Sequence, residues 1–223
     1  MIPASFGELM ADGADPALDE ATLTIAAALH RGVDLIDGLT TLDVLAGECP
    51  SPTPDGVARY LFDDLGFVGN RQAYYDWRNS CLDQVLARRH GIPITLAIVM
   101  IEVGRRLGVP LVGVGMPAHF LVGVRDEPDR YFDAFDGGRE LDAAGARALF
   151  ESVTGSRAGW APDHLAPTPN REIVIRVLNN LKAVFTRRAD RVRLGIVMEL
   201  RGAVPELHAA EADERTLTSA VFN

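Results

Sequence analysis

Residues 91–136 read GIPITLAIVMIEVGRRLGVPLVGVGMPAHFLVGVRDEPDRYFDAFD, and this stretch decides the fold. Pro93 suits the first turn of a helix, and the residues after it are apolar on nearly every side until Arg105, which predicts a buried helix. The segments LVGVGM, HFLVGV and RYFDAF that follow are rich in Val and Phe and are separated by turn residues. This pattern predicts an antiparallel meander. A buried helix followed by such a meander indicates an α+β fold.

The regions on either side of this stretch read as helical extensions. Residues 1–55 are predicted to form an N-terminal helical segment that ends in the linker ECPSPTPDG, and residues 56–150 to form the core. Residues 151–223 are predicted to be a C-terminal helical segment. Thr168 is expected to cap its first long helix, with Pro169 at the first helical position.

Within the core, a helix is predicted in SCLDQVLARR, just before the buried helix. Ser80 with Asp83 three residues later resembles a capping box, which would begin this helix. Gly91 is expected to end it.

Composition and charge exclude several classes of function. The chain has 223 residues, of which 48% are hydrophobic and 24% charged, and its formal net charge is −9. This charge argues against nonspecific binding to nucleic acid or to an anionic membrane. The N-terminus lacks a signal-peptide pattern, and the longest apolar run, Ile92 to Ile101, is shorter than a membrane span, so we expect a cytoplasmic protein.

Cofactor motifs are absent from the sequence. Two cysteines are too few for a disulfide framework, and no Cys/His group has zinc-ligand spacing. There is neither a G-x-G-x-x-G motif nor a P-loop. We therefore expect no metal and no cofactor.

One histidine stands out from the other four. His119 follows the turn GMPA and is predicted to start a strand, and in a meander the next strand would bring Asp133 opposite to it. A carboxylate beside a histidine fixes its tautomer and raises its basicity, as a general base requires. A nucleophile at the start of the buried helix would complete a triad. An incidental structural hydrogen bond would explain the same pattern.

Several motifs in the sequence resemble those of one bacterial family. NSCLDQVLARRHGIPITLAIVMIEVGRRLGVPLVGVGMPAHFLV and FDAFDGG are similar to the SirB1 family, which has a transglutaminase-like (papain-like) core. YLFDDLGFVGN, YYDWRNS and TPNREIVIRVLNNLKAVF also match that family's pattern. The resemblance extends from about Leu18 to Phe185, and the family's tetratricopeptide-like tail is expected here in a shortened form.

The resemblance implies roles for particular positions. His119 takes the catalytic histidine position of the superfamily and Asp133 takes the catalytic aspartate position. Pro93 stands where the superfamily commonly has its nucleophilic cysteine, and SirB1-like sequences commonly have proline there too. Cys81 is the nearest thiol in sequence and is the candidate substitute nucleophile, although its place on an apolar stripe suits a small buried hydrophobe better. Thr95 is predicted to point away from the position of Pro93.

Three functions are compatible with these residues. The first is a non-catalytic binding or regulatory module whose old active-site groove receives a protein, a peptide or a small ligand. The second is a papain-like hydrolase or acyl transferase that uses His119 and Asp133 with a non-standard nucleophile or an activated water. The third is a scaffold in which the pair only holds the strands together. The candidate groove residues are Tyr74, Tyr75, Trp77, Arg78 and Asn79, which would otherwise pack a loop against the core.

Overall fold

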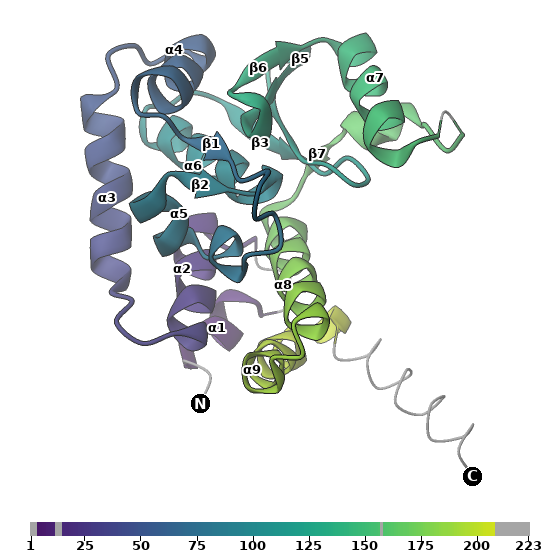
Figure 1. Ribbon diagram of the computed structural model, residues 1–223. Helices are drawn as coiled ribbons and strands as arrows, with labels where there is room; N and C mark the ends of the chain where they lie inside the picture. The colour runs from purple at the N-terminus through teal and green to yellow at the C-terminus, as the bar shows by residue number, and fades with distance from the viewer. Residues whose placement is uncertain (1–3, 12–14, 157, 208–223) are drawn as a thin grey trace.

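The computed structural model describes residues 4–11, 15–156 and 158–207 of the chain. Figure 1 shows the strands gathered in the upper part of the molecule, with most of the helices below and beside them. The elements are, in chain order, α1 (Ala4–Leu9), α2 (Leu18–Leu29), α3 (Leu35–Glu48), α4 (Pro54–Arg59), η1 (Tyr60–Asp64), β1 (Val68–Gly69), η2 (Trp77–Ser80), α5 (Leu82–Arg88), β2 (His90–Gly91), α6 (Pro93–Arg106), β3 (Leu111–Val114), β4 (Leu121–Val124), β5 (Glu127–Asp133), η3 (Ala134–Asp136), β6 (Arg139–Leu141), α7 (Ala143–Thr154), η4 (Pro162–Leu165), β7 (Pro167–Thr168), α8 (Asn170–Arg187) and α9 (Arg191–Gly202).

Five strands form one antiparallel sheet in the order β6-β5-β4-β3-β7. β3 pairs with β4 so that Val114 lies opposite Leu121, and β4 pairs with β5 so that Val122 lies opposite Phe132. The predicted meander is therefore confirmed. β7, which lies after position 150 in the chain, pairs with β3 and forms one edge of this sheet. A separate parallel pair joins β1 to β2.

Helix α6 lies at the centre of the core, because every residue from Pro93 to Gly104 is buried. Pro93 occupies its first turn, where the missing N–H would have no helical partner and the fixed φ suits the helix. The N–H of Ile92 donates to Oγ1 of Thr95 at 3.1 Å, which satisfies a donor at this end. The helix packs on β3 and β4 and also contacts α3, α4 and α5. The prediction of a buried helix is confirmed.

Charged side chains, two of them buried, stabilise the C-terminal end of α6. Glu102 and Asp19 of α2 are almost completely buried. Arg106 donates to both carboxylates at 2.8 Å, and Arg105 donates to Glu102 at 2.8 Å and to Asp19 at 3.0 Å. Burial raises the pKa of Glu102, and the neighbouring Asp19 raises it further. For Asp19, burial would raise the pKa, but the hydrogen bonds, led by that from Arg106, outweigh it and leave the pKa below its usual value.

The second face of the sheet packs on α7. Leu121 and Tyr131 of the strands meet Ala146 and Phe150 of that helix in a small apolar cluster. On the side of α6, the larger core also takes in the apolar face of α8, which packs against α9. The predicted α+β fold with helical extensions is confirmed. In the part of the chain described here, no helix combines the length and the apolar character needed to cross a membrane.

The boundaries of α5 differ from the prediction. Ser80 was expected as its cap, but Ser80 ends the 3₁₀ turn η2, and Cys81 takes the N-cap position without a side-chain hydrogen bond. At the other end Arg89 adopts the left-handed conformation with φ of 55° and terminates the helix. Gly91 belongs to β2 instead. The prediction of Ser80 and Gly91 as the two helix ends is therefore wrong.

The start of α8 lies later than predicted. The helix begins at Asn170, and Pro169 is its N-cap residue. Thr168 belongs to β7, where its hydroxyl accepts a hydrogen bond from the N–H of Gly115 at 2.8 Å. The hydroxyl therefore serves the neighbouring segment after β3 and not the helix. The residues after position 207, part of the predicted helical tail, lie outside the described chain.

Candidate functional site

His119 lies in the turn between β3 and β4, two residues before β4, and not at the start of the strand as predicted. Ala118 before it has φ of 61°, in the left-handed region that non-glycine residues seldom adopt. Arg176 of α8 holds this turn, because its Nη2 donates to the carbonyl oxygens of Met116 at 2.7 Å and of His119 at 2.6 Å. These contacts fix the backbone that carries the imidazole.

The imidazole of His119 is hydrogen-bonded to Asp133. Nε2 of His119 donates to Oδ1 of Asp133 at 2.9 Å, and the two side chains are 7% and 2% exposed. The carboxylate also accepts the backbone N–H groups of Phe135 and Asp136 at 3.0 and 3.3 Å, so the start of η3 anchors it independently. In the neutral imidazole this hydrogen bond to a carboxylate, which only accepts when ionised, places the proton on Nε2 and the lone pair on Nδ1. Nδ1 makes no hydrogen bond with any described residue.

A pocket of about 150 Å³ opens beside this histidine. Its walls come from three places: the start of α6, the turn before β4 and one face of α8. Tyr74 of the loop before η2 completes it. The lining residues are Tyr74, Ile92, Pro93, Ile94, Ala118, His119, Phe120, Arg176 and Asn180. The start of the buried helix and the histidine are thus brought to one cavity.

No ordinary nucleophile lines this pocket. Pro93 stands at the first position of α6, and the described lining contains no Cys, Ser or Thr. The Thr95 hydroxyl is buried, donates to the carbonyl of Asn79 at 2.6 Å and accepts the N–H of Ile92, so it is committed to the helix start. Burial raises the pKa of Tyr74, and the neighbouring Tyr75 adds to this shift, so the phenol stays protonated near neutral pH.

Cys81 lies in a different cluster. Its sulfur, a carboxylate oxygen of Asp83 and an imidazole nitrogen of His30 lie within 4.8 Å of one another. Nε2 of His30 is 3.1 Å from Asp83, and Trp77 packs edge-on against the same imidazole. Cys81 is fully buried, and this burial, with Asp83 nearby, raises the pKa of its thiol well above the usual value. Cys81 is not among the residues that line the His119 pocket.

The five candidate groove residues divide into two groups. Tyr74, Tyr75, Trp77 and Arg78 line a shallow hollow of about 820 Å³, with Arg187 and Arg188 at the end of α8. Arg187 lies 4.3 Å above the ring of Tyr75. Asn79 is buried instead and donates to the carbonyl oxygens of Ala73 and Tyr74, so it supports the loop from beneath. Tyr74 lines both this hollow and the His119 pocket.

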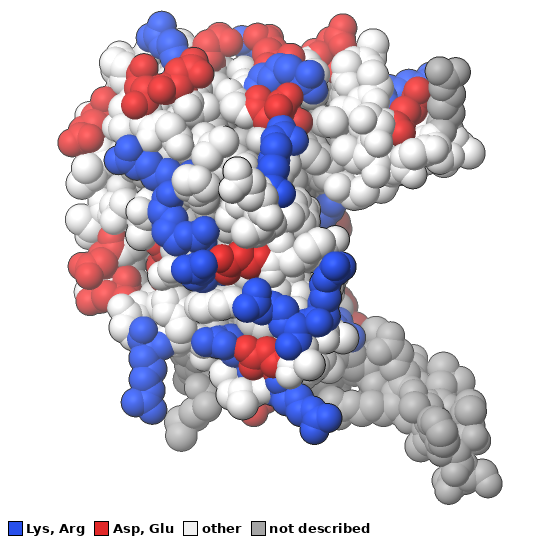
Figure 2. Space-filling model, viewed as in Figure 1, with Lys and Arg blue, Asp and Glu red and all other residues white. Residues whose placement is uncertain are grey.

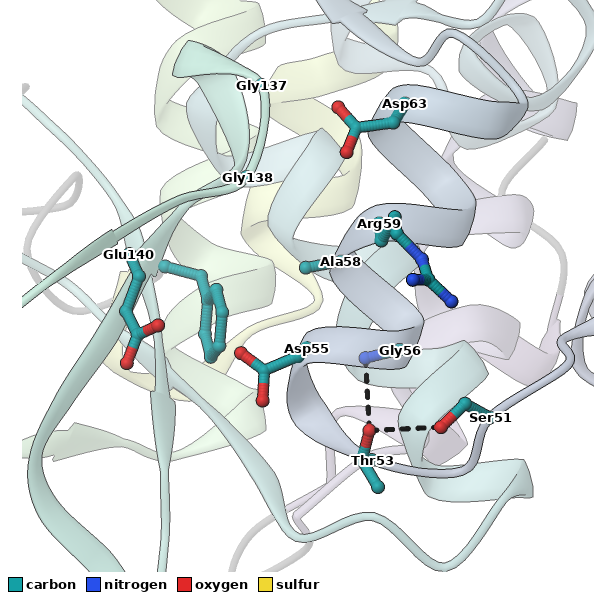
Figure 3. Close-up of a pocket in the computed structure, with 11 residues that line it drawn as sticks. Ser51, Thr53, Asp55, Gly56, Ala58, Arg59, Asp63, Gly137, Gly138 and Glu140 are labelled. Carbon is teal, nitrogen blue, oxygen red and sulfur yellow. Dashed lines mark hydrogen bonds between the residues drawn. The ribbon is translucent and has the colours of Figure 1, made fainter.

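A third cleft, of about 340 Å³, lies between α4 and the strands β5 and β6. Figure 3 shows Asp55 and Asp63 on the helical side and Glu140 on the strand side. Arg130 donates to both Asp55 and Glu140, so charges across this cleft are already compensated. Asp55 and Glu140 are therefore explained by their ion pairs with Arg130.

Arg176 and Asn180 are site residues that the sequence did not single out. Both lie on α8, more than fifty positions after His119 in the chain. One sequence feature could have indicated Arg176: it is a cation three residues after Ile173, beside the apolar face of the helix.

A central helix on an antiparallel meander, with a histidine and an aspartate at the helix start, defines a transglutaminase-like fold. A sequence-family model for the Transglutaminase-like superfamily matches residues 39–179. The chain belongs to this superfamily.

Several curated proteins are similar to the chain. The UPF0162 protein of Xylella fastidiosa (strain 9a5c) is 49% identical over 144 residues, which cover 60% of this chain and 50% of that protein. UPF0162 protein PA3419 of Pseudomonas aeruginosa is 32% identical over 184 residues, covering 78% of this chain and 67% of that protein. Human F-box only protein 21 is 40% identical over 103 residues, covering 42% and 16%. The chain spans about half the length of the Xylella relative, and no solved structure matches it.

Proposed function

We propose that this chain is a non-catalytic, SirB1-like binding and regulatory module in which the pocket beside His119 receives a segment of a partner protein or a small ligand. One observation supports the proposal: Pro93 stands at the helix start that faces the pocket, and the described residues that line the pocket include no thiol and no aliphatic hydroxyl. Such a group is the usual nucleophile of acyl transfer, and the phenol of Tyr74 in the same lining stays protonated near neutral pH. In this proposal the histidine and its pocket are retained, but the acyl-transfer chemistry is lost.

The polar groups of the pocket favour recognition. His119 offers the lone pair of Nδ1 as an acceptor, while Tyr74 and Asn180 offer further hydrogen-bonding groups beside apolar Ile92 and Ile94. The accessible surface of this pocket is more polar than apolar, which favours a ligand that forms hydrogen bonds. The segment matched in human F-box only protein 21 is 16% of that protein, which supports use of this core as a module within larger chains.

The alternative function is that of a hydrolase without a covalent intermediate. The observation in its favour is the 2.9 Å hydrogen bond between His119 and Asp133, which leaves Nδ1 as a base directed at no protein group. A water in the pocket would then be the nucleophile. The binding function requires no catalysis. A hydrolase requires turnover of a substrate, and that turnover should disappear when His119 is replaced.

A fragment screen by NMR tests the binding function. The full-length chain is titrated with neutral, cationic and anionic fragments while the backbone amide signals of residues 118–120 are followed. Asn180→Trp should remove binding by filling the pocket without touching His119 or Asp133. Thr186→Trp, at an exposed position on the same helix outside the pocket lining, is the matched control and should bind like wild type. If no fragment class shifts these amides, the pocket is not a binding site.

A further inference from the structure

Arg176 is a half-buried cation in the wall of the His119 pocket. Its Nη2 is used by the carbonyl oxygens of Met116 and His119, and its guanidinium lies 5.4 Å from the ring of Phe120. No Asp or Glu of the described residues forms an ion pair with it. Arg106 makes the contrast clear, because it is similarly enclosed but contacts three carboxylates.

The remaining donors of Arg176 are available to a ligand. Nε and Nη1 make no hydrogen bond with any described residue, and no Asp or Glu stands among the described residues of the pocket lining. Burial lowers the pKa of this guanidinium, but arginine stays protonated in proteins. Its positive charge is therefore partly withdrawn from water, with two carbonyl dipoles and the ring of Phe120 as partners and no carboxylate among the described residues. An anion that enters the pocket would supply the missing partner and would gain hydrogen bonds strengthened by charge.

We infer that the pocket binds the free C-terminal carboxylate of a polypeptide, held by Arg176; this inference rests on the proposed binding function. Nη2 belongs to both paired-donor edges of the guanidinium and is already used, so Nε–H and Nη1–H would each donate a single charge-assisted hydrogen bond to a carboxylate oxygen. The volume of about 150 Å³ is below the roughly 300–1,000 Å³ of pockets that enclose a whole drug-sized molecule. It therefore fits one terminal residue, and the rest of the ligand must lie outside.

The surface beside the pocket fits the rest of such a chain. Arg176, Asn180 and Arg187 lie within about 40° of one another around α8, since each residue turns the helix by about 100°. Arg176 and Arg187 are eleven residues apart, or about 16 Å along the axis at about 1.5 Å per residue. An extended peptide of about five residues covers this distance. Tyr74 borders both the pocket and the hollow that contains Tyr75 and Arg187, so the two are adjacent.

The charge of this face also favours an anionic ligand. Figure 2 shows Lys and Arg side chains in a band across the middle of the visible face, over the region of α5 and α8, although the chain as a whole carries −9. Arg187 and Arg188 of the hollow belong to the end of α8. Acidic side chains just before the C-terminus of the ligand would therefore meet positive charge. The ligand class is an extended peptide that ends in a free carboxylate.

Titration of the full-length chain with three probes tests this inference by NMR. The probes are N-acetylated tetra-alanine with a free C-terminus, the same peptide with a C-terminal amide, and inorganic phosphate. Each is taken to about 20 mM, which saturates a site with a Kd of about 1 mM. The free peptide should shift the amides of residues 118–120 and the Arg176 Nε–H signal, with at least about tenfold tighter binding than the amidated peptide.

Each other outcome overturns the inference in a recognisable way. Equal binding of the free and amidated peptides would leave the pocket as a binding site but remove the carboxylate as its ligand. Binding of phosphate without the free peptide would assign the site to a phosphate group. Absence of any shift with all three probes would overturn the inference, while a hit with another fragment class would still preserve the proposed function.

Variants of Arg176 give a second, independent readout. Arg176→Gln should weaken the free peptide about tenfold and leave the amidated peptide unchanged, and Arg176→Lys should lie between wild type and Arg176→Gln. Arg59→Gln, at an exposed position that lines the separate cleft of Figure 3, is the matched control and should bind like wild type. Equal affinity of all four proteins for the free peptide would contradict the role of Arg176. Because Arg176 also holds the turn at His119, the comparison of free and amidated peptide on wild type tests the inference without any variant.

Discussion

Replacing Pro93 by cysteine puts a thiol back at the start of α6, on the wall of the pocket that contains His119. If this position is that of a lost nucleophile, the introduced thiol should be activated by its surroundings. The loss of the proline ring should cost up to about 1 kcal/mol of folding stability, since proline restricts the unfolded chain. The helix itself should persist because its other first-turn contacts, such as that of Thr95, remain.

The expected activation can be estimated from two neighbours of that position. An unperturbed thiol has a pKa of about 8.5. A helix N-terminus contributes about 0.3–1 kcal/mol, and one pKa unit corresponds to about 1.36 kcal/mol, so the helix alone lowers the thiol pKa by less than about one unit. Activated cysteines, such as those at a helix start or beside an imidazolium, have pKa values of roughly 3.5–7.5. A pKa near or below about 7 would therefore require His119 as well.

The assay is the rate of iodoacetamide alkylation of the introduced thiol as a function of pH, followed by mass spectrometry of the labelled peptide. We expect Pro93→Cys to show a midpoint near or below about pH 7. The double variant Pro93→Cys, His119→Ala should shift that midpoint upward by at least about one unit, because only the helix term remains. A midpoint at or above about 8.5 in the single variant, or no difference between the two variants, would refute the placement of Pro93 opposite His119.

Further predictions concern the buried thiol and the buried ion cluster. Cys81 should be alkylated more slowly than the partly exposed Cys49 at neutral pH, because its thiol is buried and its pKa is raised; faster labelling of Cys81 would revive it as a nucleophile. Arg106→Gln should lower the free energy of unfolding by about 3 kcal/mol in urea denaturation, because it leaves Asp19 and Glu102 buried with less compensation; a loss below about 1 kcal/mol would contradict this. The fold lowers the pKa of Asp19 from its ordinary value of 3.8, so the ionised side chain stabilises the folded protein at pH values above 3.8. This contribution is lost as the pH falls from 3.8 through the lower pKa of the folded state. Asp19→Asn should therefore lose less stability than wild type between pH 7 and pH 3, and an identical pH dependence would speak against the shift.

The core of the fold could be predicted from sequence because its signals are local. Twelve consecutive buried residues from Pro93 to Gly104 contain so few polar side chains that only a central helix suits them. The Val-rich and Phe-rich segments after it alternate with turn residues, and sequential strands usually pair. The approach of His119 to Asp133 follows from the same meander, since antiparallel neighbours bring the end of β5 beside the residues that precede β4.

The remaining features depend on contacts between distant parts of the chain. Arg176 joins the pocket through a helix that begins more than fifty residues after His119, and no local pattern connects the two. Thr168 resembles a helix cap, yet its hydroxyl has a better partner in the N–H of Gly115. His30 lies at the end of α2 as its C-cap residue, and it also contacts Asp83 because α2 and α5 pack together. In each case tertiary packing brings together groups that no local pattern connects.

The central claim is that a histidine and its pocket persist here without the chemistry of the superfamily. The most direct test is hydrolysis of p-nitrophenyl acetate, an activated ester that demands little of an acyl-transfer site because its leaving group needs no protonation. General acid–base catalysis typically contributes about 10²–10⁴-fold, so a role for His119 would be well resolved. We expect wild type and His119→Ala to release p-nitrophenol at the same low rate. A faster release by wild type that is abolished in His119→Ala would contradict the claim and favour the hydrolase.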